Sequence, residues 1–133
     1  MNKNRLIIEQ LSPYDVATTV EKLIEAAIKM EWQNPATHDL QESLAKSGKE
    51  VKPVKVIEIC KPEYSGTMLE MSDERIVSVM MPCRISVYEK ADGKTYISLL
   101  NMEAMAAEMP SSIAEAVKGA SEESFEIVKS VIG

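Results

Sequence analysis

The residues best suited to chemistry are Cys60 and Cys83, the only two cysteines among 133 residues. Each lies where an apolar, β-branched run meets a proline, Cys60 before Lys61-Pro62 and Cys83 directly after Pro82. If the two runs form neighbouring antiparallel strands, the end of the first faces the start of the second, and the two thiols approach each other. Such a pair suits dithiol–disulfide exchange, sulfur transfer or the binding of a soft metal ion.

Three further residues are candidate helpers of the two thiols. Met81 offers a soft thioether two positions before Cys83, and His38, the only histidine in the chain, offers an imidazole ligand. Arg84 follows Cys83 directly, and an adjacent cation lowers a thiol pKa. The cysteine spacing matches neither a Cys-x-x-Cys redox motif nor a standard zinc pattern. The competing interpretation is that both cysteines are small buried hydrophobic residues, as free cysteines often are.

Composition excludes several classes of function. A net charge of −6 and a pI of about 4.9 argue against broad binding to the phosphate backbone of a nucleic acid, which needs clustered Lys and Arg. A local basic patch such as Lys49, Lys52 and Lys55 stays open. The apolar run near the N-terminus is too short for a signal peptide, and no run approaches the length of a membrane span. We therefore expect a cytoplasmic protein that acts away from membranes, in a compartment that keeps its thiols reduced.

Residue patterns predict the first half of the fold. Residues 5–11 indicate a strand, and a helix follows from an N-cap at Ser12 to about residue 31. Residues 37–48 indicate a second helix, capped by Thr37 or Asp39 and ended at Gly48. Residues 54–60 carry apolar side chains on both faces, which is typical of a strand inside a sheet.

The second half contains a hairpin and a long final helix. Residues 84–90 and 95–100 form strands joined by an Asp92-Gly93 turn, since this dipeptide supplies the positive φ angles of tight hairpins. Residues 63–81 suggest two short helical turns with the following side chains buried: Ile76, Val77, Val79 and Met80. A helix covers residues 101–109, and Ser111-Ser112 with Glu115 indicates a capping box for a last helix. The elements predict an α+β fold in which helices pack on one face of a curved, largely antiparallel sheet.

Three segments together resemble the family DUF302, a domain of unknown function: VIEICKPEY at 56–64, MPCRISVYEK at 81–90 and DGKTY at 92–96. The helix that opens with Ser12-Pro-Tyr-Asp is similar too, so the resemblance covers residues 5–109 of a single domain spanning 1–133, and the helix at 111–131 is an extension. The resemblance implies a curved antiparallel sheet, a homodimer and no assigned activity. It also implies that the cysteines are dispensable for folding, because many members lack them, and that His38 lies near a family histidine.

We therefore expect a small binding or redox/sulfur-handling protein rather than a hydrolase. Its site is Cys60 and Cys83, helped by Met81 and His38, and its ligand is a soft metal ion, heme or a persulfide. Two alternatives stay open. The chain is either a homodimeric interaction module with structurally buried thiols and no catalysis, or a carrier of a small apolar ligand.

Overall fold

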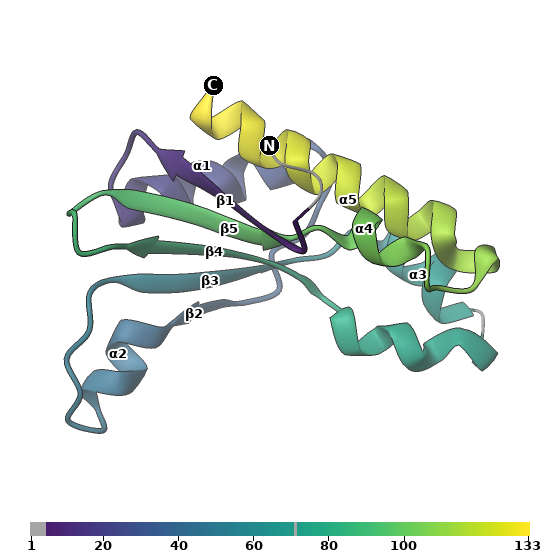
Figure 1. Ribbon diagram of the computed structural model, residues 1–133, viewed down its shortest axis with the longest axis horizontal. Coiled ribbons are helices and arrows are strands. Elements are labelled where there is room, and N and C mark those ends of the chain that lie inside the picture. The colour runs from purple at the N-terminus through teal and green to yellow at the C-terminus, as the bar shows by residue number, and fades with distance from the viewer. Residues whose placement is uncertain (1–4, 71) are drawn as a thin grey trace.

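The computed structural model describes residues 5–70 and 72–133, which form an antiparallel sheet with helices packed against it (Figure 1). Across the sheet the strand order is β1-β5-β4-β3-β2. The strands are β1 (Ile7–Ser12), β2 (Thr37–Asp39), β3 (Val54–Ile59), β4 (Cys83–Glu89) and β5 (Thr95–Leu100). The helices are α1 (Val16–Lys29), α2 (Leu40–Ala45), α3 (Pro62–Glu70), the 3₁₀ helix η1 (Ser72–Met80), α4 (Met102–Ala106) and α5 (Ser111–Ile132).

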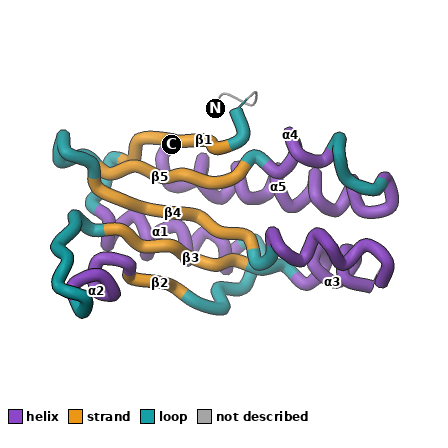
Figure 2. The backbone as a smooth tube through the Cα atoms, turned by 60° about the horizontal axis from the view of Figure 1, so that its bottom comes forward, coloured by secondary structure: helices purple, strands orange, loops and turns teal. Residues whose placement is uncertain are grey.

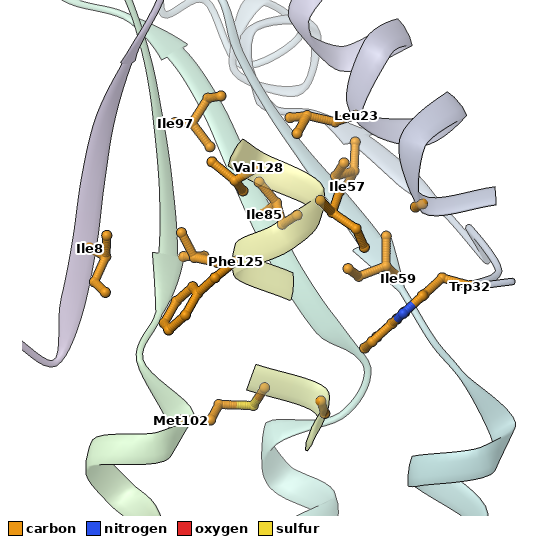
Figure 3. Packing of buried hydrophobic residues seen from close by; sticks show 14 of the residues in the cluster. Ile8, Leu23, Trp32, Ile57, Ile59, Ile85, Ile97, Met102, Phe125 and Val128 are labelled. Carbon is orange, nitrogen blue, oxygen red and sulfur yellow. The ribbon is translucent and has the colours of Figure 1, made fainter. Parts of the chain in front are cut away.

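The core lies between the sheet and the two long helices, α1 and α5, which run behind the strands in Figure 2. Ile57, Ile85 and Ile97 point from three neighbouring strands toward α1 and α5 and are fully or almost fully buried (Figure 3). Because side chains alternate along a strand, the residues next to each of these isoleucines face the other side of the sheet. The α+β prediction, with helices on one face of an antiparallel sheet, is confirmed.

The predicted hairpin and final helix are also confirmed. β4 and β5 are joined by a turn in which Gly93 adopts a φ of 77°, a conformation that glycine takes without strain. One face of α5 is buried throughout, and it carries the following residues: Ile113, Val117, Ala120, Ser124, Ile127 and Val131. Among the helices of the described residues, none combines the length and the apolar composition needed to cross a membrane.

Local capping differs from the sequence predictions at both long helices. Asp15, not Ser12, caps α1, because its side chain accepts a 2.8 Å hydrogen bond from the Thr18 backbone N–H. The Ser12 hydroxyl instead hydrogen-bonds Thr19 at 2.7 Å. α5 begins after Pro110 without any side-chain cap, so the predicted capping box at Ser111-Ser112 is wrong.

Two further predictions are corrected. Residues 37–39 are an edge strand rather than the start of a helix, because they pair with β3, and the helix begins only at Leu40. In η1, Ile76 and Val79 are 78% and 86% exposed, and only Val77 is buried. A 3₁₀ helix has three residues per turn, so a narrower set of positions faces the protein than in an α-helix. Met71, which falls within the segment 63–81 predicted to form two helical turns, lies outside the described residues.

Candidate functional site

The sheet brings the two cysteines to one end of two paired strands. β3 and β4 are antiparallel neighbours, and their register places Ile59 directly opposite Cys83. Cys60 is the next residue after Ile59, so the two cysteines occupy adjacent positions across the strand pair. Both are half-buried free thiols. The condition stated for the two runs, antiparallel pairing of neighbouring strands, is therefore met, and it places both cysteines at the same end of the strand pair.

Both thiols line one cavity of about 380 Å³, which we call the cysteine cavity. Its wall is largely apolar. Two aromatic rings, two thioethers and two prolines contribute to it: Trp32, Tyr64, Met68, Met81, Pro35 and Pro82. Residues of α3 and η1, the ends of β3 and β4, and Ala120 of α5 also line it. Figure 3 shows Trp32 beside Ile59 at this margin of the core. The predicted helper Met81 is therefore part of the wall.

The two thiols have different surroundings. Cys60 Sγ lies 3.4 Å from Ser65 Oγ of α3, whereas Cys83 Sγ lies 3.9 Å from Met102 Sδ of α4. Burial raises the pKa of Cys83 to about 11, and the neighbouring Cys60 adds to this rise. At neutral pH Cys83 is therefore a thiol and not a nucleophilic thiolate.

Arg84 is not placed to lower the pKa of Cys83. It faces Glu58 across the β3–β4 pair, one position beyond Cys83, and strand alternation turns the two side chains to opposite faces of the sheet. The Cys83 pKa is raised, which is the opposite of what activation by a neighbouring cation would produce.

His38 lies away from the cysteine cavity. It belongs to β2 opposite Val56, and its Nε2 atom lies 2.9 Å from Glu58 Oε2 on a half-exposed part of the sheet. Within residues 5–70 and 72–133, no three His, Cys, Asp or Glu side chains are grouped to hold a metal ion. The described side chains therefore do not assemble the four-residue set of Cys60, Cys83, Met81 and His38.

A carboxylate on α5 organises the rim of the cavity, and sequence reasoning missed it. Glu123 Oε1 accepts hydrogen bonds from Trp32 Nε1 at 3.0 Å and from Lys61 Nζ at 2.8 Å, while Tyr64 donates its hydroxyl to Oε2. This hydrogen bond to Glu123 raises the pKa of Lys61. One carboxylate thus ties three residues of the cavity region to α5 and neutralises the lysine beside Cys60.

Gly119, one turn before Glu123 on α5, permits this arrangement. A Cβ atom at position 119 would lie 3.2 Å from Tyr64 Cζ and only 2.7 Å from Tyr64 Cε1, and the second distance is shorter than real Cβ contacts. The tyrosine ring therefore packs directly on the helix backbone and reaches Glu123. Glu123 and Gly119 carry no local sequence signal, since a Glu-Glu pair and a single glycine in an amphipathic helix are typical of a solvated surface.

A second polar cluster lies on the opposite face of the sheet. Glu9 of β1 accepts hydrogen bonds from Tyr88 and, at 2.8 Å, from Lys90. Burial and the Glu9 carboxylate raise the pKa of Tyr88 to about 12. The Lys90 ammonium also lies 4.1 Å from the centre of the Tyr96 ring. These contacts join β1 to the β4–β5 hairpin and are already mutually satisfied, so we assign the cluster a structural role.

Comparison with known proteins identifies the fold. The family model for DUF302, a domain of unknown function, matches residues 8–130. The crystal structure of an uncharacterized conserved DUF302 protein from Bacillus stearothermophilus is similar, with a TM-score of 0.84 at 17% identity, covering 95% of this chain and 98% of that one. No functionally curated protein matches the chain. The family match continues through most of α5, whereas the sequence resemblance ended at residue 109.

Proposed function

The chain belongs to the DUF302 family, and we propose that this member binds a compact, neutral, largely apolar small molecule in the cysteine cavity. The observation that carries the proposal is the cavity itself. Its volume of about 380 Å³ falls within the range of about 300–1,000 Å³ that is usual for small-molecule sites. Its wall combines aromatic and thioether side chains with few polar groups, which is the usual composition of such sites.

Charge favours a neutral ligand. Lys61 is the one cation among the described residues that line the cavity, and it is already paired with Glu123 at 2.8 Å. An anionic ligand would have to displace that carboxylate or enter without a counter-charge, and burying an unpaired charge is unfavourable. Cys83 adds no charge at neutral pH, because its pKa is raised to about 11. In this proposal the thiols serve binding rather than redox catalysis.

The test is a titration observed at Trp32, the only tryptophan in the chain. Its indole N–H gives a single NMR signal from a side chain that lines the cavity. We expect benzyl alcohol to shift this signal with an affinity of about 1 mM, which is typical of a fragment of this size, and benzoate to shift it far less. Absence of a shift with benzyl alcohol, or equal shifts with both compounds, would refute the proposal.

A pair of variants in α3 locates the binding site. Ser65 lines the cavity and lies beside Cys60, so Ser65→Leu places a larger apolar side chain in the space that the ligand would use. Thr67 is exposed on the same helix. Its hydroxyl, like that of Ser65, donates a hydrogen bond to the backbone carbonyl four residues before it. We expect Ser65→Leu to weaken benzyl alcohol binding at least tenfold and Thr67→Leu to leave it unchanged. Equal effects would place the ligand elsewhere.

A homodimer is the second candidate, and exposed apolar residues on the open face of the sheet favour it. Ile7 and Leu100 are paired in the β1–β5 register and are 59% and 43% exposed. Contiguous exposed apolar side chains are typical of protein–protein contacts. Sedimentation of the Ile7→Lys variant tests this, with Ile28→Lys on α1, also 59% exposed, as the control. A monomeric wild-type protein would refute the dimer.

A further inference from the structure

We infer that Cys60 and Cys83 together bind a trivalent arsenical that carries one organic group, with arsenic bonded to both Sγ atoms and the organic group in the cysteine cavity. This inference rests on the proposed binding function and names its ligand class. It follows from three features of the cavity: the number and placement of the thiols, the lack of free charge, and the apolar wall beside them.

The thiols match such a ligand in number, and they share one cavity. The chain has two cysteines, and a monoorganic trivalent arsenical offers two sites for sulfur, whereas arsenite offers three. Both residues lie at the same end of the β3–β4 pair and line the same cavity. Neither thiol is held in a disulfide, so both are available for bonding.

Charge distinguishes this ligand from a monovalent soft metal cation. A monovalent cation between two thiolates leaves a net negative charge. Lys61 cannot balance this charge, because the Glu123 carboxylate already neutralises Lys61 at 2.8 Å. A buried unpaired charge is strongly unfavourable. An organoarsenic dithiolate carries no net charge. It also removes the proton from Cys83, whose raised pKa disfavours a free buried thiolate.

The binding step is a balanced condensation without oxidation or reduction. In water the ligand has the form R–As(OH)₂, and it reacts with two thiols to give R–As(S–Cys)₂ and two molecules of water. Two As–O bonds and two S–H bonds break, while two As–S bonds and two O–H bonds form. Arsenic stays trivalent throughout, and each thiol proton leaves on a departing hydroxide as water, so no oxidant or external base is needed.

The organic group has a matching environment. Trp32, Tyr64 and Met68 line the cavity around the thiols, and the two ring centres lie 6.1 Å apart. Burial of a phenyl group against such a wall gains free energy in proportion to the apolar area removed from water. An arsenical with a phenyl group is therefore expected to bind at least tenfold more tightly than arsenite, which brings no apolar surface.

The experiment measures phenylarsine oxide binding to the reduced 133-residue chain by native mass spectrometry and by the Trp32 indole signal. We expect one phenylarsenic group per chain, released by excess 1,2-ethanedithiol. Cys60→Ala and Cys83→Ala should each weaken binding by about 10²–10⁴-fold, because a second bond formed within one site gains from a high effective concentration. The C83A/S47C double variant is the matched control, since it keeps two thiols but places one on exposed Ser47.

Several outcomes would overturn the inference: two phenylarsenic groups per chain, single-cysteine variants that bind as tightly as the wild type, tight binding by C83A/S47C, or equal affinity for arsenite. The C60A/C83A variant separates this inference from the proposed function. If that variant still binds benzyl alcohol while the wild type binds no arsenical, the ligand class is wrong and the apolar site stands. If neither compound binds the wild type, the proposed function fails as well.

Discussion

Replacement of Gly119 by alanine tests whether the Tyr64 ring is held against the α5 backbone. Alanine is favoured over glycine inside a helix by about 1 kcal/mol, so a site with free space would become more stable. Here the new methyl group would lie 2.7 Å from Tyr64 Cε1, and the ring has to move. Overpacking of this kind costs about 1–3 kcal/mol. Loss of the hydrogen bond from Tyr64 to the Glu123 carboxylate costs about 1.5–3 kcal/mol more.

Together these effects predict that Gly119→Ala lowers the free energy of unfolding by about 1.5–5 kcal/mol. Gly66 of α3 provides the matched control, because the nearest atom to its added Cβ is Glu70 Oε1 at 4.0 Å. Gly66→Ala should therefore raise the free energy of unfolding by about 0.5–1 kcal/mol. Urea unfolding followed by far-ultraviolet circular dichroism measures both variants. Equal stabilisation by the two substitutions would refute the packing described for Tyr64.

Three further predictions concern the cavity and its supports. In Cys60→Ser, the iodoacetamide alkylation rate of Cys83, followed by mass spectrometry, should rise about tenfold per pH unit from pH 8 to 10, because burial raises its pKa. Glu123→Gln should lower the unfolding free energy by about 1–2 kcal/mol near pH 7. This loss should shrink as pH rises through the Lys61 pKa, which Glu123 raises in the folded state, since only protonated Lys61 gains from the ion pair. Asn101→Ala should cost about 1–3 kcal/mol in urea unfolding, because the buried side chain caps α4 and donates to the Arg5 carbonyl.

Two of these predictions have a control variant, and the third has an outcome that would contradict it. For Glu123, the adjacent exposed residue Glu122 is changed to glutamine, and an equal loss of stability would remove the special role of Glu123. For Asn101, the exposed Ser112 is changed to alanine, because it was predicted as a cap and makes no capping bond. For Cys83, an alkylation rate that levels off near pH 8 would contradict the raised pKa.

The sheet and the long helices were predictable because their signals are local. The Asp92-Gly93 turn fixes the β4–β5 hairpin, and apolar side chains on both faces identify β3 as a strand inside the sheet. If β3 and β4 pair antiparallel, as they do, Cys60 and Cys83 must lie at the same end of the pair. Edge strand β2 was not predictable in the same way, because three residues give no measurable period and its pairing with β3 depends on distant residues.

The rim of the site depends on contacts that no local pattern reveals. Glu123 is 91 residues from Trp32 and 59 from Tyr64, yet it binds both. Nothing in the neighbourhood of Glu123 distinguishes it from the solvent-exposed glutamate before it. Likewise, adjacency in sequence suggested that Arg84 activates Cys83, whereas strand alternation separates the two side chains and burial sets the thiol pKa.

The most direct test of the central claim is an intermolecular NOE experiment with benzyl alcohol and methyl-labelled methionines. Met68 and Met81 line the cysteine cavity, whereas Met30 lines a separate hollow between α1 and α5 with charged neighbours such as Lys22 and Glu25. We predict NOEs from the ligand to the methyl groups of Met68 and Met81 and none to Met30. NOEs to Met30 alone, or to no methionine at saturating ligand, would contradict the assignment of the cysteine cavity as the binding site.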